Sequence, residues 1–423
     1  MMLIVIGFVV LLFLGIPIAY VLGITTLLYI LSIENLALLA SAPQRMVSGV
    51  SNYGLLAIPL FVLVGEIMNQ GGITTRLVEF AKVLLGHLRG GLAYVNIVAN
   101  MFLAAIMGSA NAQTAMMSKV MVPAMEKEGY KREFSTALTV SSALIGPIIP
   151  PSMVFIIYAV TAEVSIGKMF MGGIIPGIIL GLGFILLVYF ISLKANFPKT
   201  ERASINRIVR SFVSVLPALS IPLIIIIGIM SGVFTATESA AVATFVALVL
   251  GKYFYKELKF RDLPTIFINT AVNSSVVTFI IAMATIFGWV LTFERIPQLV
   301  AQSLINFSDS PIVFLLLCNL LFLFIGMFIE GIAAIIILVP VLLPVAVSFG
   351  IDPVQFGIIL CINLTIGLIT PPVGTAMFIA SSITKVKMET LSRALVPFLV
   401  VAIIVLALVT YVPKLTLWIP DLV

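Results

Sequence analysis

The sequence predicts an all-α polytopic membrane protein built from an inverted structural repeat, with two re-entrant hairpins and two broken helices. Composition is the first observation: 61% of the 423 residues are hydrophobic and only 9% are charged, whereas soluble proteins are about 25% charged. Long uncharged stretches are the second observation, and glycines and prolines that recur between the two halves are the third. Together these observations exclude an ordinary soluble protein.

Uncharged stretches long enough to cross a membrane recur along the whole chain. About 20 apolar residues span the hydrocarbon core as a helix. We expect the first stretch to hold two short spans that turn near Tyr20–Gly23, with the N-terminus outside. Stretches of the required length occupy 1–33, 90–118, 134–162, 169–193, 211–237, 263–293, 310–329, 331–351, 353–384 and 394–413.

Lysine and arginine residues, which give the chain a net charge of +6, indicate which loops face the cytoplasm. They gather in short clusters between the apolar stretches, at 76–89, 127–132, 194–210, 252–261 and 385–393. Loops of this kind face the cytoplasm in membrane proteins. We therefore assign the basic residues to membrane topology and expect no nucleic-acid binding.

The first two basic clusters share a side although one apolar segment separates them, so that segment must enter the membrane and return. We expect a re-entrant hairpin at 91–125 with its tip at Gly108–Ala112. A second hairpin is expected at 311–345, entering from the other side, with its tip at Gly326–Gly331. Irregular backbone is tolerated at membrane depth only where it is buried in protein or lines a watery cavity.

A gapless offset of 221 residues aligns glycines and prolines of the two halves. The pairs are Pro123 with Pro344, Gly129 with Gly350, Gly146 with Gly367, Pro150 with Pro371, Pro151 with Pro372 and Pro176 with Pro397. Residues 16–24 also match 221–229 at an offset of 205, which predicts about 16 extra residues in the second copy. Because the charge pattern gives the copies opposite orientations, the sequence has the inverted repeat typical of secondary transporters.

Each half contains one helix that is predicted to break in the middle, at 134–165 and at 355–384. The breaks fall at Gly146–Ser152 and Gly367–Gly374, where successive prolines remove backbone donors. A plain proline kink is the alternative interpretation. The freed carbonyl oxygens would suit an alkali cation, because hard cations prefer oxygen ligands.

We expect two cation sites, each where a hairpin tip meets a break, together with a substrate-binding site. The first cation site would use Ser109, Asn111, Gly146, Ile149 and Pro151. The second would use Gly326, Glu330, Gly367, Thr370 and Val373. The substrate would contact Ser152, Gly374 and Thr375.

A few charged residues stand alone in apolar surroundings. Glu330 is the only one between Asp309 and Asp352, so it is either functional or a cap on the following half-helix. Glu238 is expected to cap a helix, and His87 is expected in a solvated linker. The sequence offers no grouping of nucleophile, base and orienting acid, so we do not expect an enzyme.

The runs Gly108–Ala110, Gly146–Ser152, Phe234–Ala241 and Thr370–Gly374 resemble the large membrane subunit of tripartite ATP-independent periplasmic (TRAP) transporters, over nearly the whole chain. The resemblance implies a bacterial inner-membrane protein that imports an acidic solute, sialic acid or a four-carbon dicarboxylate, with sodium ions by an elevator motion. It also implies two partners besides membrane lipid: a periplasmic substrate-binding protein and a small four-helix membrane subunit. The chain departs from the family pattern at Ala110-Asn111 and at Ala236.

These expectations divide the chain into scaffold, arms and transport domain. The scaffold would be 1–70 and 212–292, the arm helices 71–90 and 293–310, the transport domain 91–193 and 311–423, and the cytoplasmic linker 194–211. Three other functions stay open: a channel, a stand-alone cation-coupled carboxylate symporter, and the permease of an ATP-driven importer. A channel would need a continuous polar pore, and an ATP-driven permease would need a loop that docks on an ATPase.

Overall fold

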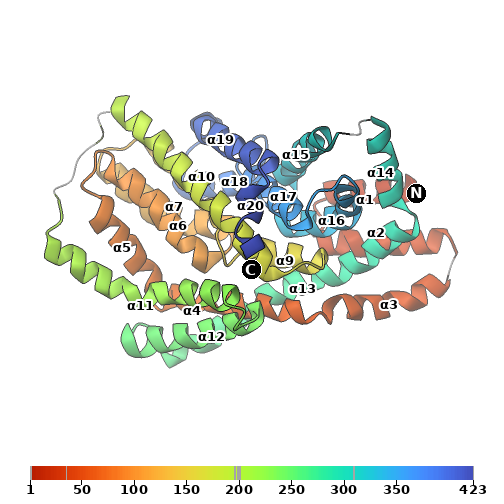
Figure 1. The fold of residues 1–423 in the computed structure, drawn as a ribbon, viewed down its shortest axis with the longest axis horizontal. Helices are drawn as coiled ribbons and strands as arrows, with labels where there is room; N and C mark the ends of the chain where they lie inside the picture. Colours follow the sequence, from red (N-terminus) through yellow and green to blue (C-terminus); the bar gives the residue numbers. More distant parts are fainter. Residues whose placement is uncertain (1, 35, 195–196, 198–201, 308–309, 423) are drawn as a thin grey trace.

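The protein is helical throughout the part that its computed structural model describes, which is residues 2–34, 36–194, 197, 202–307 and 310–422 (Figure 1). No strand occurs in these residues. Eight of their helical segments are long and apolar enough to cross a membrane. The predicted all-helical membrane class is confirmed.

The helices follow one another in two series. The first half contains α1 (Met2–Phe13), α2 (Ile18–Ser32), α3 (Leu36–Val50), α4 (Ala57–Gln70), α5 (Ile73–Leu85), α6 (Gly91–Met107), α7 (Ala110–Lys127), α8 (Arg132–Ala143), α9 (Met153–Thr161) and α10 (Ile166–Lys194). The second half contains α11 (Ile205–Met230), α12 (Ala236–Val249), α13 (Leu263–Phe293), α14 (Ile296–Phe307), α15 (Pro311–Phe328), α16 (Gly331–Ser348), α17 (Pro353–Gly367), α18 (Thr375–Thr384), α19 (Met388–Tyr411) and α20 (Lys414–Leu417). In Figure 1, helices α3, α4, α11, α12 and α13 lie along the lower side, and α10, α17 and α19 lie along the upper side.

The offset that aligns glycines and prolines also aligns helices. The first residues of α7 and α16 are 221 positions apart, and so are those of α8 and α17. Residues 108–109 and 329–330 separate the two helices of each hairpin, and residues 144–152 and 368–374 separate the two parts of each broken helix. The tips and breaks therefore recur as backbone features in both halves.

The second match, at an offset of 205, is wrong. Pro17 directly precedes α2, whereas Pro222 lies inside α11. The equivalent scaffold helices are α2 and α12, because α2 packs on α13 while α12 packs on α4. The scaffold thus follows approximately the same offset as the rest of the chain, and the second copy needs no insertion of 16 residues.

Two predicted boundaries also shift. The first two helices turn at Leu14–Pro17 and not near Tyr20–Gly23, because Gly15 adopts a left-handed φ of 73° and Pro17 starts a new helix. Helix α11 begins inside the predicted linker 194–211, where Ser204 Oγ accepts a hydrogen bond from the Arg207 backbone N–H. A serine cap of this kind favours a helix start.

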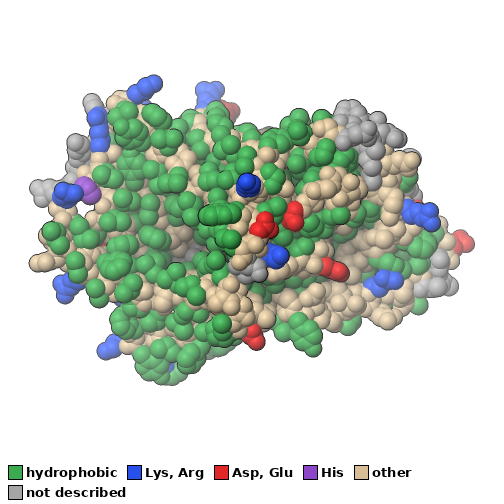
Figure 2. Space-filling view, viewed as in Figure 1, with side chains coloured by type: hydrophobic (Ala, Val, Ile, Leu, Met, Phe, Trp, Pro, Cys, Tyr) green, Lys and Arg blue, Asp and Glu red, His purple; other side chains and the backbone are tan. Residues whose placement is uncertain are grey.

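Four of the predicted cytoplasmic clusters meet at one end of the molecule. Arg207 Nη2 lies 3.0 Å from Glu79 Oε1, and Arg76 Nη1 lies 2.7 Å from Glu257 Oε1. The rings of Tyr130 and Phe197 stack with centroids 4.7 Å apart. The left end of Figure 2 shows lysine, arginine and histidine side chains in this region.

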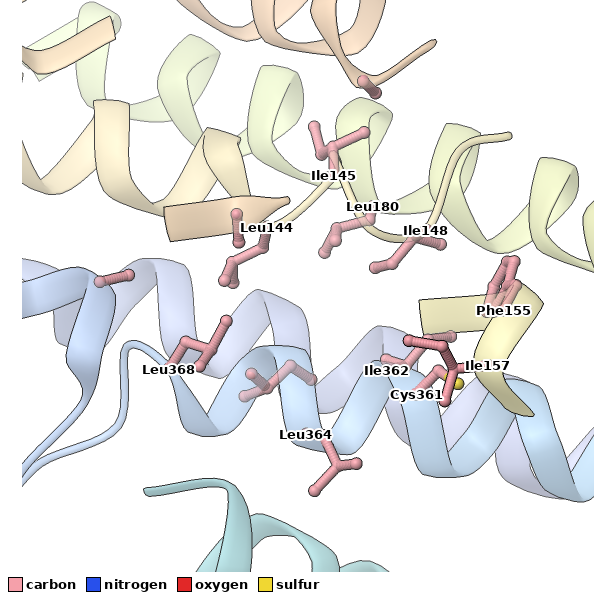
Figure 3. Packing of buried hydrophobic residues seen from close by; sticks show 14 of the residues in the cluster. Leu144, Ile145, Ile148, Phe155, Ile157, Leu180, Cys361, Ile362, Leu364 and Leu368 are labelled. Atoms are coloured by element: carbon pink, nitrogen blue, oxygen red, sulfur yellow. The ribbon is translucent and has the colours of Figure 1, made fainter. Parts of the chain in front are cut away.

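The two halves share one apolar core. Helix α7 packs on α8 of its own half and on α18 of the other half, and α16 packs on α17 and on α9. Figure 3 shows Leu144, Ile145 and Ile148 of the first break between α10 and α17. These side chains are at most 1% exposed and belong to one buried cluster. Each hairpin is therefore held by helices from both halves.

Candidate functional site

A cavity of about 330 Å³ lies where both hairpin tips, both broken helices and the helices α4 and α13, which we expect to belong to the scaffold, meet. Its lining includes residues 107–112 of the first tip, 330–332 of the second tip, and Phe61, Glu66, Asn69, Asn273 and Val277 of the scaffold. The broken helices contribute Pro147, Pro151, Met153, Val154, Leu364, Thr365 and Leu368. Of the predicted site residues, the cavity brings together Ser109, Asn111, Pro151 and Glu330.

The first tip is a tight turn that approaches the first break. Gly108 has a left-handed φ of 54°, and a Cβ placed on it would stand 3.4 Å from the carbonyl oxygen of Pro151. Ser109 Oγ accepts a hydrogen bond from the Ala112 backbone N–H at 3.5 Å. Ser109 therefore starts α7 as its N-cap, which leaves its hydroxyl partly engaged within the tip.

A chain of buried side chains leads from α8 toward the first break. Asn96 Nδ2 donates to Thr139 Oγ1 at 2.6 Å, and Asn100 Nδ2 donates to Asn96 Oδ1 at 2.8 Å. Gln113 Nε2 donates in turn to Asn100 Oδ1 at 2.8 Å. All four side chains are fully buried. Because every amide donates in the same direction, the chain ends at Gln113 Oε1, to which no described residue donates.

This terminal oxygen lies against the first break. A Cβ placed on Gly146 would stand only 2.2 Å from Gln113 Oε1, so the close approach requires glycine. A buried oxygen without a donor costs about 1–3 kcal/mol, and a bound cation or water would remove that cost. Sequence reasoning named Gly146 but missed Gln113, because an uncharged amide within a hairpin helix gives no signal in charge or composition.

The second tip is held against its break through backbone contact. A Cβ on Gly367 would stand 2.4 Å from the carbonyl carbon of Gly326. The Gly374 N–H donates to the carbonyl oxygen of Met327 at 3.3 Å. Thr370 Oγ1 donates to the Ile366 carbonyl at 2.8 Å, which leaves the hydroxyl lone pairs available as acceptors.

Two carboxylates line the cavity, and its described lining includes no lysine, arginine or histidine. Glu330 is the N-cap residue of α16, but its side chain makes no capping hydrogen bond, so the predicted capping role is not observed. Glu66 of α4 was missed. It is the only charged residue between Arg45 and Arg76, which is the same signal that singled out Glu330.

One polar contact joins the two halves beside the cavity. Thr375 Oγ1 donates to Asn111 Oδ1 at 3.3 Å, so a residue predicted for the substrate contacts one predicted for the first cation site. At the repeat offset, their counterparts are Val154 and Ile332, which are apolar and line the cavity. The position that corresponds to this contact beside the second tip is therefore apolar, although Glu330 of that tip lines the cavity.

Other predicted residues lie outside the cavity lining. Ser152 Oγ accepts from the Phe155 N–H at 3.3 Å and donates to the Pro147 carbonyl, so both functions of its hydroxyl are used locally. Ile149 packs on Gly177 of α10. The lining also does not include Gly146, Gly326, Gly367, Thr370, Val373, Gly374 and Thr375. In the scaffold, Glu238 forms a capping box with Thr235, and its predicted capping role is confirmed.

Similarity to known proteins bears on what these features are for. Residues 5–415 match the family model described as tripartite ATP-independent periplasmic transporter, DctM component. The chain belongs to this family. It is 40% identical over 416 residues to the sialic acid TRAP transporter large permease protein SiaM of Vibrio cholerae, which covers 98% of this chain and 97% of that one.

Two further proteins extend the comparison. The C4-dicarboxylate TRAP transporter large permease protein DctM of Pseudomonas aeruginosa is 38% identical over 370 residues, covering 88% of this chain and 87% of that one. The crystal structure of the Alcanivorax borkumensis YdaH transporter matches with a TM-score of 0.65 at 14% identity, covering 91% of this chain and 88% of that chain. That likeness concerns the fold alone.

Membership of the DctM family indicates the role of the chain, its location and its partners. The chain is a TRAP transporter permease subunit and a multi-pass protein of the inner membrane. The family implies that it works with a periplasmic binding protein and a small membrane subunit. The predicted family, transport role and location are confirmed.

Proposed function

We propose that this subunit imports an acidic solute together with sodium ions, by an elevator motion of the hairpins and broken helices. The supporting observation is the cavity where all four elements meet, because Glu66 and Glu330 line it without any basic side chain in its described lining. An anion beside two carboxylates is repelled unless cations compensate the charge. Co-bound sodium ions would supply that compensation.

The first sodium ion would bind at the first tip and break. Backbone carbonyls of the break and the unpartnered Gln113 Oε1 supply the oxygen ligands that a hard cation prefers. The predicted set of Ser109, Asn111, Gly146, Ile149 and Pro151 stays a proposal, with Gln113 added.

The second sodium ion would bind between the tip at Gly326–Glu330 and the break at Gly367–Val373. The hydroxyl lone pairs of Thr370 are available there. Replacing Thr370 with Val removes the hydroxyl at nearly constant volume, so it should raise the sodium concentration needed for half-maximal uptake. Sodium dependence identical to that of the unchanged protein would remove Thr370 from the site.

The solute is proposed to be sialic acid or a four-carbon dicarboxylate. The support is the solutes named for the SiaM and DctM relatives. Ser152, Gly374 and Thr375 are outside the cavity lining, and we propose that they shape the solute site through the two breaks. Asn69 and Asn273 add polar groups from the scaffold.

The decisive experiment is uptake into vesicles that contain the complete complex. A sodium gradient with the binding protein present should drive accumulation, and ATP without the gradient should not. Accumulation driven by ATP alone would support the permease of an ATP-driven importer. Uptake that needs no binding protein would support a stand-alone carboxylate symporter.

The elevator motion can be tested with one engineered disulfide. Helix α16 packs on the scaffold helix α13, and a Cβ built on Gly288 stands 3.9 Å from the Cβ of Pro340, which fits disulfide geometry. Gly288→Cys combined with Pro340→Cys should stop uptake when oxidised and restore it when reduced. Full uptake with the bond formed would contradict a moving hairpin. The native Cys318 and Cys361 are buried, and each single variant serves as a control.

A further inference from the structure

A second cavity, of about 310 Å³, lies at the basic end of the molecule and shares no lining residue with the cavity at the hairpin tips. It is formed between the arm helix α5 and the first turns of the scaffold helix α11. Helix α5 contributes Arg76, Glu79 and Val83. Helix α11 contributes Arg207, Arg210, Ser211 and Ser214.

The charges around this cavity do not balance. Arg76 is paired with Glu257 and Arg207 with Glu79, whereas Arg210 has neither an ion-pair nor a hydrogen-bond partner among the described residues. Each guanidinium carries five donors, so Arg207 keeps donors beyond its single contact. The cavity therefore has a surplus of positive charge and of hydrogen-bond donors.

The donor set fits a phosphate group. Planar guanidinium groups bind phosphate with paired hydrogen bonds, and the Ser211 and Ser214 hydroxyls can add further donors. Arg76 is held in place, because its Nη1 donates to the Gly72 carbonyl at 2.8 Å and its guanidinium lies 4.2 Å from the centre of the Tyr255 ring. Arg76 is therefore held in one position in the cavity lining, and Arg207 and Arg210 are the cations that remain accessible to a ligand.

The surface beside the cavity is apolar. Val209, Phe212, Val213 and Leu216 of α11 are between 43% and 58% exposed, on a helix that is long and apolar enough to span a membrane. A ligand with a phosphate head and hydrocarbon tails could place the phosphate in the basic cavity and the tails on the apolar face of α11. Basic pockets at the cytoplasmic ends of membrane helices bind acidic lipid headgroups in this way.

We propose that this cavity binds the phosphate headgroup of an anionic phospholipid, with the acyl chains along the exposed face of α11. The lipid would connect the arm helix α5 to the scaffold. Lipid binding at this cavity depends only on the membrane location of the chain. It does not depend on the solute or on sodium coupling, so either proposal can fail without the other.

The test measures lipid retained by the purified complex. Complexes are extracted from membranes that contain equal amounts of phosphatidylglycerol and phosphatidylcholine, and bound lipid is counted by native mass spectrometry. We expect the unchanged protein to retain phosphatidylglycerol in preference, and Arg210→Gln to lower that retention about fivefold. Arg210 has no partner to lose, so the variant should fold normally.

Arg202→Gln is the matched control, since it removes one positive charge from an exposed residue of the same cluster outside the cavity lining. It should leave retention unchanged. Equal retention by the unchanged protein and Arg210→Gln, or no preference between the two lipids, would overturn the proposal. If inorganic phosphate raises the thermal unfolding temperature as much as short-chain phosphatidylglycerol does, the ligand is free phosphate and the lipid assignment is wrong.

Discussion

The two halves of the chain build the same backbone break but support it differently. The first break is almost fully buried. The neighbouring Gln113 side chain, whose Oε1 faces the break, is oriented by a chain of side-chain hydrogen bonds. The second break exposes Pro371 and Pro372, and its tip is held through direct contact between Gly326 and Gly367. The Pro150–Pro151 and Pro371–Pro372 peptide bonds are both cis.

This difference shows that the two halves share the residues that set the backbone path, whereas the side chains around that path differ. Glycine and proline set the backbone path, so they recur at the offset of 221 residues. Side chains only need to satisfy the groups around that path, so Ser109 stands where the second half has Glu330. The first tip has a side-chain cap from Ser109, whereas Glu330 of the second tip presents a carboxylate that makes no capping hydrogen bond.

Substitution of the two break glycines should give the largest difference. Gly367→Ala would place its Cβ 2.4 Å from backbone of Gly326, which cannot rotate away, so we expect a loss of about 3 kcal/mol in the free energy of unfolding. The severe contact of Gly146→Ala is with the end of the Gln113 side chain, and the nearest backbone atom, the Ala143 carbonyl oxygen, is 3.2 Å away, so this variant should cost less, about 1–2 kcal/mol. Denaturant unfolding in mixed micelles measures both.

Gly288→Ala is the control for this pair. Gly288 lies inside α13, and its added Cβ would meet Pro340 at an ordinary distance of 3.7 Å. Its stability should be unchanged or slightly raised. If Gly146→Ala destabilised the protein as strongly as Gly367→Ala, the two breaks would not differ in being held by a side chain in one half and by backbone contact in the other.

Breaking the amide chain should have the next largest effect. Asn100→Leu removes the side-chain donor to Asn96 Oδ1, whereas Gln113 Nε2 keeps the backbone carbonyl of residue 100 at 2.7 Å. A buried acceptor is left without a donor, so we expect a loss of about 2 kcal/mol. The matched change in the second half is Asn319→Leu, because Asn319 Oδ1 accepts from Asn363 Nδ2 at 2.7 Å and Asn319 Nδ2 donates to Thr410 Oγ1 at 3.1 Å. Asn363 would keep its bond to the Ile359 carbonyl at 2.8 Å, so this variant should lose only about 1 kcal/mol. A larger loss in Asn319→Leu would reverse the comparison.

Substitutions at the two tips should affect different properties, stability at the first tip and transport at the second. Ser109→Ala removes a long capping bond of 3.5 Å and should cost about 0.5 kcal/mol of stability. Glu330→Gln removes no side-chain cap, so stability should be unchanged, while sodium-driven uptake should fall at least tenfold in line with the proposed site. Thermal unfolding and vesicle uptake are measured on the same preparations. Unchanged uptake by Glu330→Gln would show that this carboxylate takes no part in transport.

The sequence anticipated the hairpin tips and the breaks because glycine, proline and lone charges act locally, and their effects do not depend on tertiary packing. Glu66 could have been found by the criterion that identified Glu330. Gln113 could not, because its role arises from packing between α7 and the break at Gly146. The first turn lies at Leu14–Pro17 and not near Tyr20–Gly23 because Gly15 and Pro17 act locally, whereas the match at an offset of 205 relates helices that are not equivalent.

The packing of each hairpin on helices from both halves has a consequence for biosynthesis. Helix α7 is complete at Lys127, but its partner α18 begins only at Thr375. At about 5–20 residues per second, the ribosome needs roughly 12 to 50 s to make the intervening chain. During that interval the newly made first hairpin lacks one of its permanent neighbours, and the insertion machinery or lipid must shelter its Asn111 side until the second half arrives.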